Sequence, residues 1–379
     1  MARIGLLVLV AASTVSLVTC LCQNLTIPLS ISAQNAKFAF TVPSSNIEVT
    51  DFILNLAQQG GSFASDVQTG SAMVSGNYSI AAQYCTPDSG LVKGLQILTH
   101  GVGFDRSYWD LPINNYNYSY VAQALERGYG TFAYDRLGIG QSSHGEPLNE
   151  IQSTLEVAAL RALTTGLRDL TLPGIVDSYS KIFHVGHSFG SIQSYGLTAE
   201  VAAEGNGENI SDGIALTGFT SAPQFVPYFL YGGQFVSAPT LPALQASYAN
   251  GYLAAGSESA VQSNFFAPGT FEPEMLALAM QTGQPVTVGE LLTLAAPASA
   301  PNGYAGPVLV VTGNRDIPFC GGNCTTSNSS YPALVQSNFA NASNFQATVV
   351  PGAGHGLNLE YTHPITYGAI LDFFDKYAT

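Results

Sequence analysis

The sequence predicts an α/β protein with a mostly parallel, doubly wound sheet, and three observations lead to this class. From Leu91 onward, short apolar segments alternate with segments of helical periodicity, as in parallel strands joined by helices. An apolar run ending at His187 breaks into Gly-His-Ser-Phe-Gly and continues at helical spacing, so Ser188 is expected on a sharp turn between strand and helix. The alternation stops from Ser221 to Pro307, which predicts an inserted cap.

The individual elements follow from the same periodicities. Alternating apolar and polar residues predict antiparallel strands at 35–43 and 73–85, with a helical pattern between them in 45–70. Continuous apolar runs predict buried strands at 91–99, 129–134, 181–187, 213–218, 308–312 and 345–350. Amphipathic patterns predict helices at 121–127, 150–170, 331–339 and 364–377, and shorter helices in the cap at 241–253 and 273–280.

The N-terminus has the pattern of a secretory signal peptide. Arg3 is followed by an apolar run and then by small or polar residues. An N-terminal membrane anchor is the alternative, but no later segment is apolar enough to span a bilayer, so we expect no stable membrane insertion. The expected domains are a signal peptide (1–20), an α/β core (21–220 and 306–379) and a helical cap (221–305).

Sequons and cysteines also favour an extracellular protein. Seven Asn-X-Ser/Thr sequons predict glycosylation at Asn24, Asn77, Asn117, Asn209, Asn323, Asn328 and Asn341. Cleavage after Cys20 leaves four of the five cysteines, an even number that suits disulfides. The close spacing of Cys320 and Cys324 favours one pair and leaves Cys22 for Cys85, although four cysteines allow three pairings. A zinc site is the alternative, but the chain lacks a second close pair, so no metal is expected.

The charge balance excludes one class of partner. Lys and Arg number 11 against 25 Asp and Glu, so the surface repels a phosphate backbone, and we expect no nucleic acid partner. The glycine-rich segment 135–142 lacks the Gly-Lys-Ser/Thr ending of a phosphate-binding loop and the Gly-X-Gly-X-X-Gly pattern of a dinucleotide site. We therefore expect Asp135 and Arg136 to order their loop, and no cofactor.

Three polar residues follow three predicted parallel strands and should meet at the carboxyl edge of the sheet. In chain order they are Ser188, Asp316 and His355. A serine hydroxyl is a weak nucleophile until a base takes its proton, which His355 would do while Asp316 orients the imidazole. Backbone N–H groups of Val102 and Phe189 would stabilise an oxyanion beside this serine. The pentapeptide alone is weak evidence, because Gly and Ser are common in this chain.

In combination, these motifs resemble the α/β-hydrolase family, in the branch with a single lid insertion and Ser-Asp-His order. The matching segments are His-Gly-Val-Gly at 100–103, Asp-Arg-Leu-Gly-Ile-Gly-Gln-Ser at 135–142, Gly-His-Ser-Phe-Gly at 186–190, Gly-Asn-Arg-Asp at 313–316 and Gly-His at 354–355. A serine at position 188, where haloalkane dehalogenases and epoxide hydrolases have aspartate, argues against those two classes.

The resemblance implies a secreted esterase, lipase or lactonase that acts on a small apolar ester or lactone. Cap aromatics, among them Phe225, Phe229 and Phe265, are expected to line the substrate pocket. An acyltransferase with the same triad is the nearest alternative, and a non-hydrolytic binding protein on the same fold is another.

Overall fold

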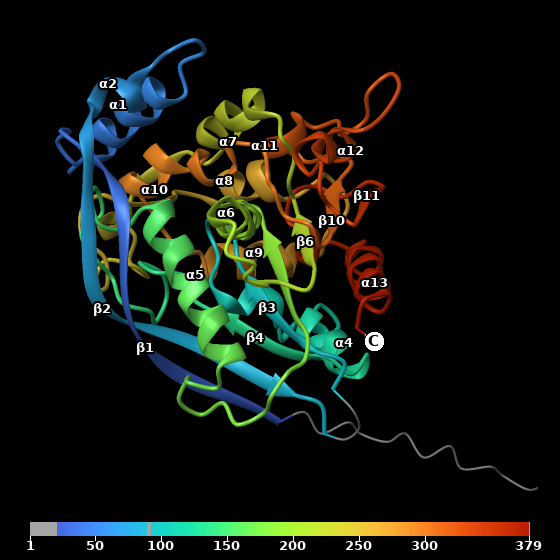
Figure 1. Cartoon of the computed structure of the whole chain (residues 1–379). Helices are drawn as coiled ribbons and strands as arrows, with labels where there is room; N and C mark the ends of the chain where they lie inside the picture. Colours follow the sequence, from blue (N-terminus) through green and yellow to red (C-terminus); the bar gives the residue numbers. More distant parts are fainter. Residues whose placement is uncertain (1–20, 89–91, 379) are drawn as a thin grey trace, which may run out of the picture.

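The computed structural model describes residues 21–88 and 92–378, so the expected signal peptide lies outside the described residues. Eight strands form the central sheet in the order β1-β2-β4-β3-β5-β6-β10-β11 (Figure 1). β1 is antiparallel to β2, β2 is antiparallel to β4, and the remaining neighbours are parallel. The strands are β1 (Leu21–Phe38), β2 (Gln68–Thr86), β3 (Leu95–Thr99), β4 (Gly130–Tyr134), β5 (Ile182–His187), β6 (Ile214–Thr217), β10 (Pro307–Gly313) and β11 (Asn344–Val350).

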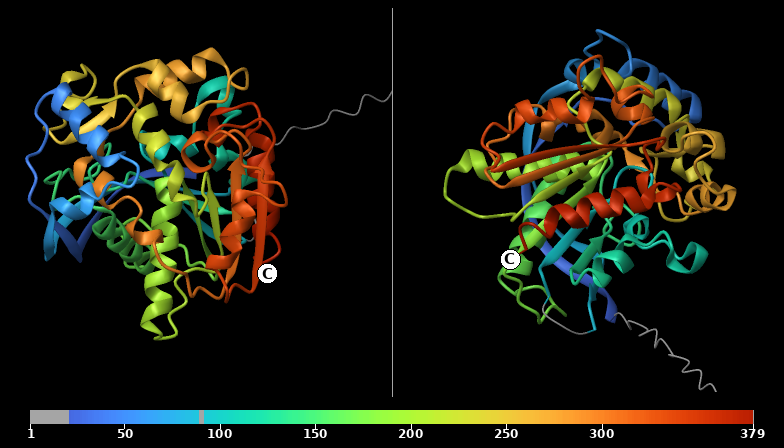
Figure 2. Two further views of the ribbon diagram at one scale, coloured as in Figure 1. Left: turned by 90° about the horizontal axis from the view of Figure 1, so that it is seen from above. Right: turned by 90° about the vertical axis from the view of Figure 1, so that its right-hand side faces the viewer.

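Helices cover both faces of the parallel strands, which explains why those strands are mostly apolar. Every residue of β3, β4, β5 and β6 is buried. α5 (Ser153–Arg168) and α6 (Phe189–Glu204) lie on one face, and α4 (Tyr120–Glu126) and α13 (His363–Phe374) on the other (Figures 1 and 2). Short helices α3 (Ile113–Tyr116), α11 (Ile317–Cys320) and α12 (Tyr331–Leu334) lie in the connections. The doubly wound, mostly parallel sheet is as predicted.

The cap lies between β6 and β10, over the end of the sheet where the parallel strands terminate (Figure 1). It contains α7 (Val226–Gly232), β7 (Phe235–Ser237), β8 (Tyr252–Ala255), α8 (Glu258–Phe265), α9 (Pro273–Gln281), β9 (Val286–Thr287) and α10 (Val288–Thr293). β7, β8 and β9 form a small antiparallel sheet, so the cap is not purely helical.

The helix predicted at 241–253 is wrong. The structure has turns there, followed by β8. Leu244, Tyr248 and Tyr252 recur every four residues and so imitate a helix, but they pack into a small cluster of their own. Gly251, at φ 93°, ends the turns in a conformation that a helix excludes. The helix predicted at 273–280 is confirmed as α9.

The N-terminal residues form an arm that reaches the cap. β1 and β2 make a long hairpin whose far end carries α1 (Asn46–Leu56) and α2 (Phe63–Val67) (Figure 1). The Ser45 side chain caps α1 in a capping box with Glu48. The strand predicted at 35–43 is wrong in its bounds, since β1 spans Leu21–Phe38 and residues 39–43 are irregular.

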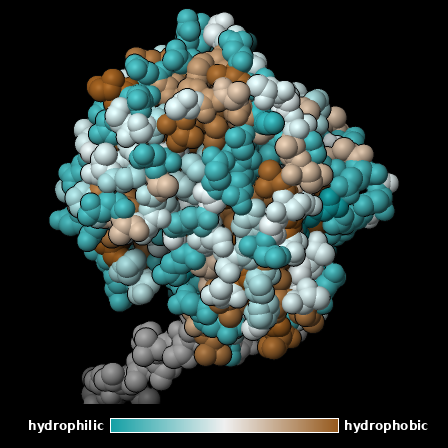
Figure 3. All heavy atoms as spheres, turned by 90° about the vertical axis from the view of Figure 1, so that its left-hand side faces the viewer, coloured by the Kyte–Doolittle hydropathy of each residue, from teal (hydrophilic) through white to brown (hydrophobic). Residues whose placement is uncertain are grey.

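The arm is joined to the cap by hydrogen bonds and apolar packing. Asn46 Oδ1 accepts a hydrogen bond from the Ser237 N–H at 3.0 Å. Val49, Phe52 and Ile53 of α1 belong to the same buried cluster as the cap residues Phe229 and Phe235. The side of the molecule that bears the hairpin and α1 mixes hydrophilic and hydrophobic residues (Figure 3), as the alternating burial along β1 requires. The base of the hairpin is closed by a disulfide between Cys22 and Cys85, which are paired across the two strands.

Candidate active site

Ser188 occupies the turn between β5 and α6 in a strained backbone conformation, with φ 56° and ψ −116°. The flanking glycines are required by space. A Cβ on Gly186 would lie 2.4 Å from the Gly190 carbonyl oxygen, and a Cβ on Gly190 would lie 2.1 Å from the Thr99 carbonyl oxygen. The predicted strand, sharp turn and helix are confirmed, and the turn holds Ser188 at the carboxyl edge of the sheet.

Asp316 and His355 are in direct contact at the same edge. Asp316 caps α11, where its Oδ1 accepts a hydrogen bond from the Phe319 N–H at 2.8 Å. Its Oδ2 lies 2.6 Å from His355 Nδ1, and both side chains are fully buried. The other ring nitrogen, Nε2, is buried and has no hydrogen-bond partner within the described part of the chain. With its Nδ1–H directed at a carboxylate, His355 presents Nε2 as a proton acceptor.

Aromatic rings hold the His355 imidazole from two sides. Phe265 of the cap stacks with it at 5.8 Å between ring centroids, and Phe319 of α11 at 5.4 Å. His187 lies 4.9 Å away. A Cβ on Gly218 would come within 2.9 Å of both imidazoles, and its φ of 56° also favours glycine. Sequence reasoning missed Gly218 and Phe319. The position of Gly218, directly after a buried strand, was the available signal for that residue.

The two predicted oxyanion donors flank Ser188. A Cβ on Gly101 would lie 2.9 Å from Ser188 Cβ, so the loop that carries Val102 passes directly beside the serine. Val102 and Phe189 both line the cavity that includes Ser188. Neither residue's N–H donates a hydrogen bond to any of the described residues. These two N–H groups are therefore free to donate to an oxygen on the substrate.

The other histidines of the core are held as neutral, structural groups. His100 accepts a hydrogen bond from the Arg136 N–H at Nε2, and its Nδ1 bonds the Gly101 carbonyl. Burial, with the nearby Arg136 charge, lowers the pKa of His100 well below its usual range. Burial also lowers the pKa of His184 to about 3 and that of His187 well below its usual range. These contacts give His100 a structural role in its loop.

Glu360 is a buried carboxylate that joins the His355 loop to the cap. Its Oε2 accepts a hydrogen bond from the Gly354 N–H at 2.6 Å, next to His355. Its Oε1 accepts from the Ala267 N–H at 2.6 Å and from the Thr270 hydroxyl at 2.8 Å, both in the cap. Burial, with a smaller effect from the Asp316 charge, raises the pKa of Glu360 to about 7. This link between the His355 loop and the cap was not predicted from the sequence.

Arg136 forms a buried ion cluster next to the elbow, the strand–turn–helix segment that carries Ser188. Its Nη1 lies 2.6 Å from Oε1 of Glu156 in α5 and 2.6 Å from Oε1 of Glu290 in α10 of the cap. Its guanidinium also stacks 4.7 Å from the ring of Phe189. Asp135, next to it, accepts hydrogen bonds from the Arg106 N–H and Gln141 N–H. These contacts match the prediction that Asp135 and Arg136 order their loop.

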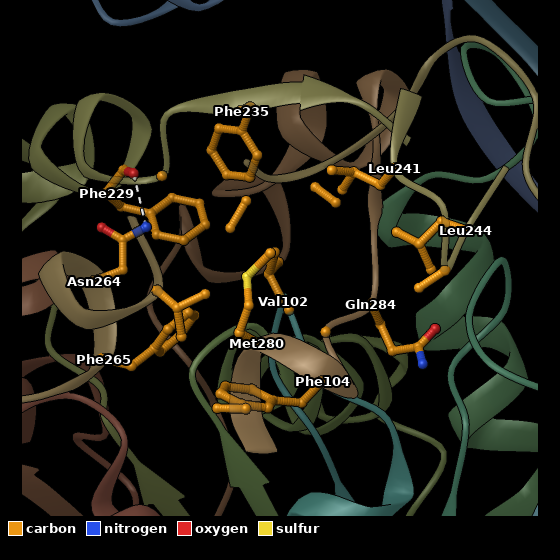
Figure 4. Close-up of a pocket in the computed structure, with 18 of the residues that line it drawn as sticks. Val102, Phe104, Phe229, Phe235, Leu241, Leu244, Asn264, Phe265, Met280 and Gln284 are labelled. Carbon is orange, nitrogen blue, oxygen red and sulfur yellow. Dashed lines mark hydrogen bonds between the residues drawn. The ribbon is translucent and has the colours of Figure 1, made fainter. Parts of the chain in front are cut away.

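Two apolar cavities adjoin the carboxyl edge of the sheet. The serine cavity, about 40 Å³, contains Ser188 with Phe189, Ile192 and Phe319 in its wall. The cap cavity, about 130 Å³, lies between the cap and the loop that follows β3 (Figure 4). Phe229 and Phe265, two of the three aromatics expected at the substrate pocket, line the cap cavity. Phe225 lines neither cavity and packs against Tyr331 and Gly321 instead.

The structure contains the second expected disulfide, Cys320–Cys324, whose first cysteine lies four residues after Asp316. Among the described residues, no group of three or more His, Cys, Asp or Glu side chains is arranged to hold a metal ion. No helix within 21–88 or 92–378 has both the length and the hydropathy needed to cross a bilayer.

Comparison with solved structures shows the same fold in three hydrolases. They are a thermophilic esterase from Thermogutta terrifontis (TM-score 0.52, 18% identity, 80% of this chain and 96% of that chain), a lipase in an open form (0.53, 18%, 80% and 96%) and epoxide hydrolase A from Mycobacterium thermoresistibile (0.50, 18%, 78% and 95%). A sequence comparison with curated proteins gives no match. The family model described as "Alpha/beta hydrolase family" matches residues 96–366, a segment that holds the elbow, the buried Asp-His pair and the cap. This chain therefore belongs to the α/β-hydrolase family.

Proposed function

We propose that the protein is a secreted serine hydrolase that cleaves an apolar carboxylic ester or lactone through an acyl-enzyme intermediate. The observation that carries the proposal is the 2.6 Å contact between Asp316 Oδ2 and His355 Nδ1 at the edge where Ser188 occupies a strained elbow. The unpartnered Nε2 of His355, within the described chain, supports the role of base. Membership of a hydrolase family agrees with a small-molecule substrate.

In the proposed mechanism, Ser188 Oγ attacks the ester carbonyl carbon while His355 Nε2 takes its proton. Asp316 keeps the imidazole in the correct tautomer and stabilises the imidazolium. The N–H groups of Val102 and Phe189 bind the oxyanion, and loss of one donor in such a hole costs about 10²–10³ in rate. The C–O bond to the alcohol then breaks, and the alcohol leaves with the proton from His355. Water, activated by the same histidine, releases the acid and restores Ser188.

The walls of both cavities favour an uncharged, apolar substrate. Among the described residues, the serine cavity has Ser188 as its single polar side chain, and the cap cavity has only Asn264 and Gln284. A charged group in either cavity would lose its hydration without finding a partner of opposite charge. We therefore assign the cap, residues 221–305, to substrate selection.

Secretion is part of the proposal. The two disulfides suit an oxidising compartment. Every sequon asparagine is exposed at the surface, as glycosylation requires: Asn24, Asn77, Asn117, Asn209, Asn323, Asn328 and Asn341.

Labelling with a fluorophosphonate, followed by assays on p-nitrophenyl esters of increasing chain length, tests the chemistry. The wild-type protein should be labelled at Ser188 and should hydrolyse short esters. Ser188→Ala should remove labelling and lower kcat by about 10⁴-fold or more. Ser191→Ala is a control in the first turn of α6, which begins directly after Ser188, and should retain labelling because its hydroxyl is bonded to the Thr217 carbonyl. Hydrolysis by Ser188→Ala at a rate near that of the wild type would exclude Ser188 as the nucleophile.

A further inference from the structure

The serine cavity and the cap cavity are neighbours that share two lining residues. Val102 and Phe229 line both of them. Val102 comes from the loop after β3 and Phe229 from α7 of the cap, and the ring of Phe229 is directed into the cap cavity (Figure 4). A substrate bound at the catalytic edge therefore meets two separate apolar spaces on either side of a partition.

The reacting groups are divided unequally between the two spaces. Ser188 lines the serine cavity and not the cap cavity. His355 lies between the two, because it stacks on Phe319, which lines the serine cavity, and on Phe265, which lines the cap cavity. An acyl group stays bonded to Ser188 Oγ until water releases it, so it belongs in the serine cavity. The alcohol is bonded to the oxygen that His355 protonates, and the cap cavity is the space that remains for it.

The volumes of the two cavities limit the size of the acyl and alcohol parts of the substrate. At about 40 Å³, the serine cavity has room for roughly three water-sized groups, which is enough for an acetyl or propionyl chain. The cap cavity measures about 130 Å³. An apolar protein cavity of about 150 Å³ binds benzene, so the cap cavity suits a single ring or a branched alkyl group of similar size.

Most polar side-chain atoms at the cap cavity are already bound to protein groups. Asn264 Nδ2 donates to the Phe229 carbonyl at 3.1 Å, whereas its Oδ1 packs against Gly232 and has no hydrogen-bond partner among the described residues. Gln284 donates to Asp105 Oδ2 and accepts from the Tyr248 hydroxyl. Its amide lies at the rim, away from the phenyl rings (Figure 4). The space between the rings is therefore selective for apolar groups.

We propose that the cap cavity is the binding site for the alcohol part of the substrate, and that the substrate is a short-chain acyl ester of a monocyclic or similarly sized apolar alcohol. This inference rests on the proposed serine hydrolase function. The partition formed by Val102 and Phe229 keeps the acyl group short, because a longer chain would meet Phe229.

Two isomeric esters separate the two cavities. Benzyl acetate carries its ring on the alcohol, and methyl phenylacetate carries the same ring on the acid. The two esters have the same molecular formula, and their leaving alcohols have closely similar acidity. The wild-type protein should hydrolyse benzyl acetate with a kcat/KM at least about tenfold higher.

Ala279 and Ala277 provide a matched pair of variants in α9. Ala279 is buried and lines the cap cavity, whereas Ala277 is exposed and lines neither cavity. Ala279→Phe should fill the cavity and remove the preference for benzyl acetate, and Ala277→Phe should keep it. Saturable binding of toluene to the Ser188→Ala protein, followed by NMR, tests the cavity without turnover. The binding should be lost when Ala279→Phe is added and kept when Ala277→Phe is added.

Equal rates for the two isomers, or a preference for methyl phenylacetate, would overturn the assignment while leaving the serine hydrolase proposal intact. Retention of the benzyl acetate preference in a folded Ala279→Phe protein would also overturn it. If the wild-type protein hydrolyses no ester, the proposed function fails. The toluene experiment then decides whether the cap cavity is an apolar ring site, and absence of saturable binding would refute that too.

Discussion

Replacing Glu360 by Gln exchanges one carboxylate oxygen for an NH₂ group in a buried site that contains three hydrogen-bond donors. The carboxylate accepts hydrogen bonds from the N–H groups of Gly354 and Ala267 and from the Thr270 hydroxyl. A glutamine has one oxygen, and its NH₂ group would face a donor on the other side. One buried donor is then left unsatisfied, which costs about 1–3 kcal/mol of unfolding free energy. A protonated Glu360 avoids much of this cost, because its single hydrogen can turn away from the donors.

The raised pKa of Glu360 makes this difference depend on pH. Its pKa is about 7 in the folded protein against an ordinary 4.5, so the folded state binds more protons than the unfolded state between these values. The stability from this group is therefore fully present below about pH 4.5 and is lost as pH rises through 7. The loss is on the order of 3 kcal/mol in total. The Glu360→Gln variant has no titrating group at this position. The unfolding free energy of the wild type should therefore exceed that of the variant most at pH 5, and this difference should shrink as pH rises.

Urea unfolding of both proteins at pH 5, 6, 7 and 8 measures this gap. Thr270→Val is the matched control, because it removes one donor and leaves both oxygens of Glu360. It should cost about 0.5–1.5 kcal/mol and should keep the pH dependence. Since Gly354 precedes His355, Glu360→Gln should also lower kcat by about 10–100-fold at pH 8. A gap that stays constant or widens with rising pH would refute the sign of the argument.

Three further predictions concern the catalytic edge and its support. Asp316→Asn should retain the fold, measured by circular dichroism, and should lose about 10⁴-fold in kcat, because an amide presents the wrong partner to His355 Nδ1–H. Full activity of this variant would mean that the acid lies elsewhere. Reduction of Cys320–Cys324 should lower both activity and melting temperature, because the bridge closes the loop after Asp316. Peptide mass mapping without reduction that finds both thiols free would contradict this. Arg136→Met should destabilise the fold by about 3–5 kcal/mol in urea, and replacing its two glutamate partners by leucine as well should restore part of the loss. An unchanged urea midpoint would show that the cluster contributes nothing.

The central sheet could be predicted because parallel strands covered on both faces leave a direct mark on the sequence. The run 308–311 is apolar at every position, and its strand lies within one residue of the predicted bounds, 308–312. The strand predicted at 91–99 is shorter and begins at Leu95. The elbow could be predicted for a different reason. Nearby carbonyl oxygens leave no room for a Cβ at position 186 or 190, so both positions require glycine, and glycine is visible in the sequence.

The missed features depend on neighbours that are distant in the chain. Leu244, Tyr248 and Tyr252 have helical spacing, but their packing in a separate cluster determines a turn. Phe319 is one of many phenylalanines in the sequence, and only the stacked ring of His355 distinguishes it. Glu360 follows His355 closely, but its bonds to Ala267 and Thr270 are formed across the cap boundary. No local pattern encodes such contacts.

The packing of α1 against the cap has a consequence for how the chain folds during synthesis. Val49, Phe52 and Ile53 are made early, but their partners Phe229 and Phe235 come much later in the chain. At a synthesis rate of about 5–20 residues per second, roughly 10 to 40 s separate the two. During that interval Phe52 can pack against its arm neighbours Phe40 and Phe63, but the part of α1 that contacts the cap lacks its partner and is open to aggregation or to a chaperone. The arm is thus synthesised first and docks late, and such long-range closure slows folding.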